Sequence, residues 1–116
     1  MGNRWLASIA SRNGRERVEL VDLRNGQPVP LPGINQADAQ PISVSVSADG
    51  NRIALIRSRD GRTELMLYRR GVGILQRLPV EPAGVPREVS LDGSGRLLAV
   101  QVSRQGRWDV DLIRLP

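Results

Sequence analysis

The residues best suited to chemistry in this sequence are arginines in a pentapeptide that occurs three times. The copies are SRNGR at residues 11–15, SRDGR at residues 58–62 and SRQGR at residues 103–107. A guanidinium group forms bidentate hydrogen bonds with carboxylates and phosphates, so several of them on one surface would bind an anionic partner. With the tryptophan that follows the last copy, the candidate binding residues are Arg12, Arg15, Arg59, Arg62, Arg104, Arg107 and Trp108.

The same pentapeptide has a structural interpretation. Asn13-Gly14 and Asp60-Gly61 are residue pairs that tolerate positive φ, and they favour a tight hairpin turn whose twist matches the flanking strands. Gln105-Gly106 is a weaker form of that signal. The turn needs no ligand to explain it. In this interpretation, which we favour, the arginines are solvated and paired with nearby carboxylates, and each pair contributes little stability.

Other catalytic chemistry has little support in the sequence. There is no His and no Cys, which removes Ser–His and Cys–His catalysis, most zinc sites and disulfides. Asp109 and Asp111 share one face of a strand, but neither recurs at the equivalent positions of the other copies. Asp49-Gly and Asp92-Gly lack the later acidic ligand of a calcium loop. We therefore expect a protein that is not an enzyme and that needs no cofactor or metal.

Charge and composition limit the possible partners. The net charge is +5, all 17 basic residues are Arg, and only 3% of residues are aromatic. We do not expect a nucleic-acid reader, because no recognition helix or stacking surface accompanies the arginines. No apolar run is long enough to span a membrane. The start, MGNRWLASIASRNG, lacks the apolar stretch of a signal peptide and suggests a mature or trimmed segment.

An internal repeat organises the chain. A shift of 47 residues aligns Ala7, Ser11, Gly14 and Leu20 with identical residues, and a further shift of 45 aligns all four again, without a gap. The units cover approximately residues 1–33, 41–79 and 87–116 of a single domain. Such self-similarity at a fixed period is typical of repeat architectures.

Within each unit the pattern is that of β-strands. ISVSVS at residues 42–47 alternates with period two, and RIALI and LLAVQV are short apolar runs. Four short strands in about 45 residues is the spacing of propeller blades. With the strands of a blade named A to D from inside to outside, the chain reads BCD-ABCD-ABC. The prediction is an all-β, propeller-type partial ring of about three four-stranded antiparallel blades.

The repeat also indicates which aromatic residues lie in the core and which face solvent. Tyr68 aligns with Val21 and Ile113 and is expected in the core, whereas Trp108 aligns with polar residues and is expected to face solvent. Trp5 aligns with one arginine and one leucine, so its environment stays open. An exposed Trp beside Arg107 has the composition of an interface anchor, and packing on its own blade is the alternative.

These units resemble the propeller repeats of the TolB family, whose founding member is the periplasmic protein of the Tol system. The resemblance rests on VSADGNRIALIRSRDGRTELMLY at residues 46–68 and LDGSGRLLAVQVSRQGRWDVDLI at residues 91–113. It implies blade structure and a binding platform in the cell envelope or periplasm, without transferring any binding residue. The family's propeller is six-bladed and joined to another domain, so this chain corresponds to half a ring.

Three functional hypotheses follow. The first is a binding or assembly module that engages a protein partner and forms a homodimer of about six blades, because three blades leave sheet edges unpaired. Its contact surface would be the rim where the turns between strands B and C meet the loops at residues 32–41 and 79–86. The second is the propeller domain of an envelope hydrolase whose catalytic part lies elsewhere. The third is an anion- or nucleic-acid-binding basic surface.

Overall fold

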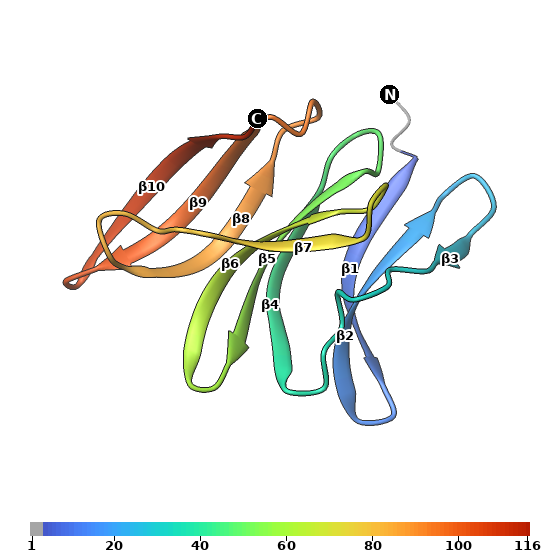
Figure 1. Ribbon diagram of the computed structural model, residues 1–116, viewed down its shortest axis with the longest axis horizontal. Helices are drawn as coiled ribbons and strands as arrows, with labels where there is room; N and C mark the ends of the chain where they lie inside the picture. The colour runs from blue at the N-terminus through green and yellow to red at the C-terminus, as the bar shows by residue number, and fades with distance from the viewer. Residues whose placement is uncertain (1–3) are drawn as a thin grey trace.

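The fold consists of antiparallel sheets that stand side by side like the vanes of a fan (Figure 1). The structure, a computed structural model, describes residues 4–116, which hold ten strands and no helix. The first sheet contains β1 (Trp5–Arg12), β2 (Arg15–Asp22) and β3 (Gln27–Val29). The second contains β4 (Ala39–Val46), β5 (Arg52–Arg59), β6 (Arg62–Arg69) and β7 (Ile74–Leu78). The third contains β8 (Val85–Leu91), β9 (Leu97–Arg104) and β10 (Arg107–Arg114).

This arrangement confirms the all-β, open propeller-type fold and the strand pattern BCD-ABCD-ABC. We call the three sheets blade 1, blade 2 and blade 3 in chain order. The central blade has all four strands. Within the described residues, blade 1 has no inner strand beside β1 and blade 3 has no outer strand beside β10. Strands β1, β5 and β9 begin at Trp5, Arg52 and Leu97, which reproduces the sequence offsets of 47 and 45 residues.

The repeated pentapeptide forms a two-residue hairpin turn in every blade. Asn13 and Gly14 have φ values of 54° and 75°, and Asp60 and Gly61 have 52° and 72°. Gln105 and Gly106, the weakest signal in the sequence, adopt the same conformation with 48° and 78°. Positive φ at both central residues defines the turn whose twist suits the flanking strands. The structural interpretation of the pentapeptide is therefore confirmed.

Two apolar layers hold the blades together. Between blades 1 and 2, Leu20 packs with Ile53 and with Tyr68, whose hydroxyl donates a hydrogen bond to the carbonyl of Pro32 at 2.7 Å. Between blades 2 and 3, Ile56 and Leu67 pack against the inward side of β9. Each blade is thus stabilised by burial against its neighbour, the usual origin of stability in repeat proteins. Among residues 4–116 no helix is long and apolar enough to cross a bilayer.

Trp5, which the repeat left unassigned, belongs to the layer between blades 1 and 2. Its ring is 9% exposed and lies between two guanidinium groups, with Arg4 at 4.5 Å and Arg70 at 4.6 Å from the ring centroid. Cation–π attraction of this kind favours a buried tryptophan between basic residues. Gly50 supplies the space, because a Cβ atom there would lie 2.5 Å from the ring.

We therefore expect Gly50→Ala to destabilise the protein more than Gly61→Ala. Both glycines have φ near +70°, and alanine costs about 1–2 kcal/mol in that region. A Cβ at Gly61 meets nothing within 4 Å, whereas at Gly50 overpacking against Trp5 adds roughly 1–3 kcal/mol. Urea unfolding of both variants measures the difference. Equal unfolding midpoints would show that Trp5 moves aside freely.

Candidate binding surface

The three hairpin tips lie along one border of the fan, at its lower and left edge in Figure 1. We call this border the rim. The connections between blades reach it too: the Gln36 side chain accepts a hydrogen bond from Arg57, and the Pro82 carbonyl accepts one from Arg104. The hairpin tips and the connecting loops thus gather at one end, as expected from the strand pattern. Loops on a rigid scaffold are a common location of binding sites.

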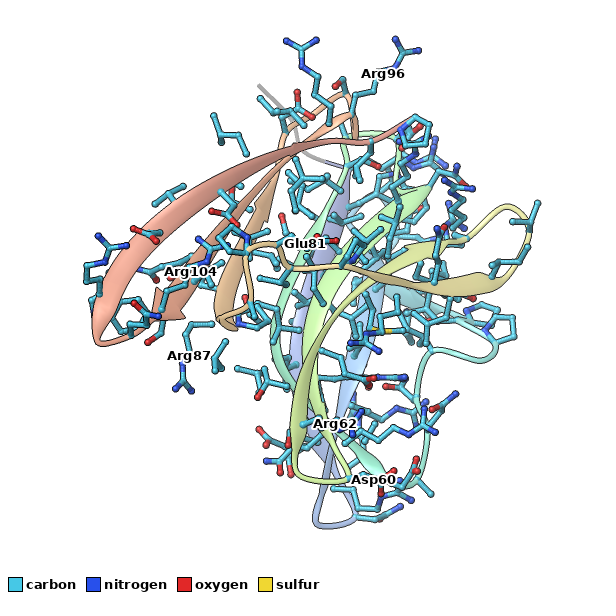
Figure 2. All side chains as sticks on the ribbon, turned by 60° about the vertical axis from the view of Figure 1, so that its left-hand side comes forward. Asp60, Arg62, Glu81, Arg87, Arg96 and Arg104 are labelled. Atoms are coloured by element: carbon cyan, nitrogen blue, oxygen red, sulfur yellow. The ribbon has the colours of Figure 1, made fainter. Side chains whose placement is uncertain are left out.

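Arg104 lies on this rim but is buried and fully engaged (Figure 2). Its guanidinium donates hydrogen bonds to Asp111 at 2.9 and 2.5 Å, to Asp109 at 3.3 Å and to the Pro82 carbonyl at 2.9 Å. The Arg104 hydrogen bond lowers the pKa of the Asp111 carboxyl, and the two aspartates raise the pKa of Arg104. Asp109 and Asp111 do share a face of β10, and on that face they form an ion pair with Arg104.

Two further rim arginines are paired at the surface. Arg12 donates hydrogen bonds to the Glu19 carboxylate at 2.8 and 3.1 Å, and this contact lowers the pKa of Glu19. Arg59 lies 3.2 Å from a carboxylate oxygen of Asp38. Such exposed pairs contribute little to stability but occupy the guanidinium.

The remaining rim arginines are available for contact. Within the described part of the chain, no carboxylate lies within 4 Å of the guanidinium groups of Arg15, Arg62 or Arg107, all of which are exposed. The six arginines therefore divide into three that are paired and three that are free.

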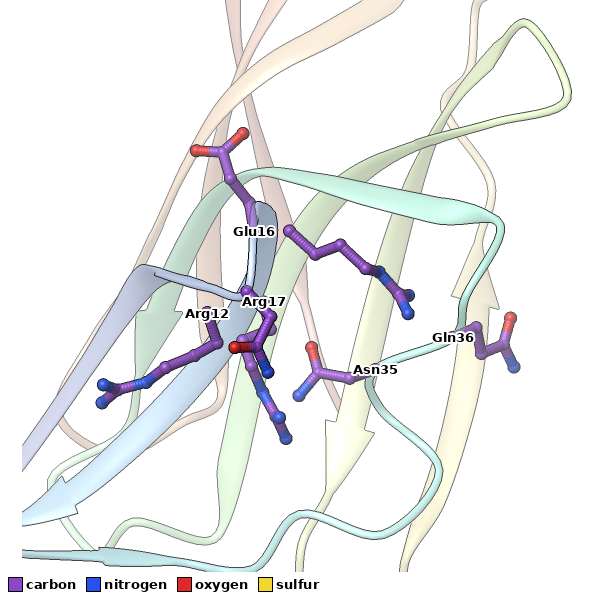
Figure 3. Close-up of a pocket in the computed structure, with 7 residues that line it drawn as sticks. Arg12, Glu16, Arg17, Asn35 and Gln36 are labelled. Carbon is purple, nitrogen blue, oxygen red and sulfur yellow. The ribbon is translucent and has the colours of Figure 1, made fainter.

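A cavity of about 260 Å³ opens at the rim of blade 1 (Figure 3). Asn35 is fixed at its wall, because its side-chain amide bonds both the N–H and the C=O of Val18, at 2.8 and 2.9 Å. Arg17, Asn35 and Gln36 were not identified from the sequence as part of a site. Only the expected position of residues 32–41 near the rim pointed toward Asn35 and Gln36, and no sequence signal pointed toward Arg17. The cavity is lined by Arg12, Asn13, Arg15, Glu16, Arg17, Asn35 and Gln36.

The carboxylates of the two Asp-Gly segments stabilise turns. Asp49 accepts hydrogen bonds from the Ser47 hydroxyl at 2.6 Å and the Asn51 N–H at 2.9 Å, and the serine contact is the main cause of its lowered pKa. Asp92 accepts bonds from Ser94 and from the N–H groups of Arg96 and Leu97.

The outward face of blade 3 is apolar. Trp108, Val110 and Leu112 alternate along β10 and are 62%, 67% and 67% exposed. The repeat places Val110 and Leu112 at the positions of Leu65 and Leu67, which are each 1% exposed between blades 2 and 3. Trp108 faces solvent, as its repeat column predicted. We call this surface, completed by Leu97 and Val85, the blade 3 flank.

The sheets, the hairpins and the burial between blades define a propeller-type fold. No protein-family model and no curated protein matches the chain. Solved structures do: TolB from Acinetobacter baumannii superimposes with a TM-score of 0.70 and 20% identity, covering 96% of this chain and 27% of that protein. A putative TolB from Agrobacterium tumefaciens gives 0.71 and 19%, covering 96% and 39%.

The chain thus has a TolB-like propeller fold, which confirms the resemblance seen in the repeats. It spans well under half the length of either protein.

We expect Arg104→Gln to lower the stability of the protein at neutral pH, because it leaves Asp109 and Asp111 without their cation. Arg107→Gln, an exposed neighbour in the same hairpin, is the matched control and should have little effect. Thermal unfolding at pH 7 measures both.

The same ion pair has a pH signature. The folded-state pKa of Asp111 is lowered, so its contribution is present above the ordinary carboxylate pKa of about 4 and is lost as the pH falls below it. The variant Arg104→Gln should therefore lose less stability than the natural chain between pH 7 and pH 3. An equal loss in both proteins would contradict this assignment.

Proposed function

We propose that this chain is a non-catalytic interaction module that self-associates through the open flanks of its outer blades. The observation that carries the proposal is the blade 3 flank, where Val110 and Leu112 are exposed at positions that are buried in the contact between blades 2 and 3. Exposed apolar surface of this kind on a folded domain marks a contact site. A partner sheet would cover it in the same way as blade 3 covers Leu65 and Leu67.

The outward face of blade 1 offers a complementary but more polar surface. Leu6, 49% exposed, and Val21 occupy the positions of Ile53 and Tyr68, whereas Ser8 and Glu19 stand where blade 2 has Leu55 and Met66. Two copies joined flank to flank, blade 3 of one on blade 1 of the other, would give six blades. Because one half of that contact is mixed in polarity, we expect it to be weaker than the contacts inside a chain.

The location of the module rests on resemblance. The TolB-like fold supports a place in the cell envelope, and a protein partner there besides a second copy. The two similar structures are 20% and 19% identical to this chain over the part that superimposes, which is 27% and 39% of those proteins.

Self-association predicts a mass in solution near twice that of the chain, measurable by light scattering. Val110→Asp should shift this mass to that of a monomer, because it buries a carboxylate in the apolar flank. Val72→Asp is the matched control, since Val72 is equally exposed at 66% but lies in the turn between β6 and β7. A stable monomer of the natural chain at high concentration would refute the dimer.

A second candidate function is anion binding at the rim, favoured by the exposed guanidinium groups of Arg15, Arg62 and Arg107. Arg15 also lines the cavity of blade 1 together with Arg17. Figure 2 shows Arg62 and Arg96 at opposite ends of the molecule. This separation provides a charge-matched comparison for testing the rim.

We expect Arg62→Glu combined with Arg107→Glu to abolish retention on heparin at low salt, because phosphate- and sulfate-type contacts depend on such side chains. Arg96→Glu combined with Arg114→Glu makes the same charge change at the other end and should retain most of the binding. If the natural chain ignores heparin and DNA at low salt, the anion-binding function is dismissed.

A further inference from the structure

The inner strands of blades 2 and 3 meet through serine side chains. The Ser43 hydroxyl accepts a hydrogen bond from the Val89 N–H at 3.2 Å, and the Ser45 hydroxyl accepts one from the Leu91 N–H at 2.9 Å. Both N–H groups belong to β8 and point away from β9, the one strand within residues 4–116 that pairs with it. Hydroxyl groups at alternate positions of β4 therefore supply acceptors to an edge that would otherwise lack them.

The equivalent N–H groups of β4 have no such acceptor. Val44 and Val46 of β4 occupy the positions of Val89 and Leu91 of β8. The register of β4 shifts between Pro41 and Ser43 and that of β8 between Pro86 and Glu88, so the two strands match after the shift. The Ser47 N–H donates a hydrogen bond to the Arg52 carbonyl. Because backbone groups alternate in direction along a strand, the N–H groups of Val44 and Val46 point away from β5. Within residues 4–116 no side chain accepts a hydrogen bond from either N–H.

These N–H groups border a groove of about 450 Å³ beside β1. One wall of the groove is formed by residues 4–7, at the start of β1. The other wall is formed by residues 44–48, at the end of β4 and in the turn that follows. Leu91 and Gly93 complete its wall. It lies where the missing inner strand of blade 1 would stand, and Trp5 is part of its lining.

Among residues 4–116 no strand pairs with the facing edge of β1 either. The Leu23 N–H donates a hydrogen bond to the Arg4 carbonyl at 2.6 Å. With the register of β1 and β2, this means that the backbone groups of Leu6 and Ser8 point toward β2 and bond to it. The backbone groups of Trp5, Ala7 and Ile9 then point toward the groove. One groove thus presents an open strand edge on one side and two free N–H groups on the other.

We propose that this groove binds an extended strand of a partner protein, antiparallel to β1, that carries serine or threonine at alternate positions. The backbone of the strand would pair with β1, the β-augmentation mode of peptide recognition. Its hydroxyl groups would accept hydrogen bonds from Val44 and Val46, as Ser43 and Ser45 do for β8. This groove is separate from the blade 3 flank, so the inference does not depend on self-association.

A second copy of the chain is a poor occupant. The alternating serines of this sequence lie in β4, which is paired with β5 and bonded to β8 in the centre of the molecule. Offering that segment to a neighbour would require unfolding the central blade. A second copy therefore does not supply this strand from its own β4.

The test uses a synthetic peptide with the sequence of residues 39–48, AQPISVSVSA, and the Trp108→Phe variant of the chain. Trp5 is then its only tryptophan, because the sequence has two. Titration should give a saturable change in Trp5 fluorescence. A peptide with Ser43→Ala and Ser45→Ala should bind more weakly by about fivefold for each lost hydroxyl, the effect of one net hydrogen bond.

A variant of the groove provides the second measurement. Ala7→Pro removes an N–H that faces the groove and should weaken peptide binding at least tenfold, whereas the bonds to β2 remain. Val110→Pro makes the matching change at the outward edge of β10 and should leave binding unchanged. If Ala7→Pro fails to fold, the comparison of the two peptides still decides the question on the folded chain.

Three results would overturn the proposal: equal affinity for the two peptides, no change in Trp5 fluorescence, or loss of binding in Val110→Pro. If Ala7→Pro instead alters the mass in solution and the peptide does not bind, the groove holds a second copy. Binding of the peptide to the Val110→Asp variant separates this inference from the proposed self-association.

Discussion

The structure depends on one constraint: each sheet has two faces, and an apolar face is stable only when the next sheet covers it. Blade 2 satisfies the constraint on both sides, through Tyr68 and Leu20 toward blade 1 and through Leu67 and Leu98 toward blade 3. The outer blades satisfy it on one side only. The hairpin turns, the serine contacts between inner strands and the cavity for Trp5 all serve this face-to-face packing.

The uncovered surfaces are where the chain can interact, and they differ in chemistry. The rim offers guanidinium groups on rigid turns, the blade 3 flank offers aliphatic side chains and a tryptophan, and the groove beside β1 offers backbone hydrogen-bonding groups. The rim and the blade 3 flank adjoin at Arg107 and Trp108, whereas the groove lies beside β1. The three proposed contacts, with an anionic group, an apolar sheet and an extended strand, would therefore use distinct physical means.

How well the sequence predicted these features depended on whether their cause is local. The turns at Asn13-Gly14 and Asp60-Gly61 could be predicted because these residue types themselves tolerate positive φ. The repeat offsets then predicted the strand pattern of the three blades. The burial of Trp5 could not be predicted because it depends on contacts with Arg70 and Gly50, which are distant in sequence. Arg104 looked like its five counterparts, and only the pairing of β9 with β10 brings it to Asp111. Asn35 became part of a site through a loop contact that no periodicity records.

The nearly equal spacing of the three hairpins has an evolutionary consequence. Since strands contact mainly their own sheet and the adjacent one, a unit of 45 to 47 residues is a transferable building block whose duplication leaves existing contacts intact. Lineages can lengthen or shorten such an array by unequal recombination without redesigning a core. Arcs of different blade number are then accessible from one ancestral module.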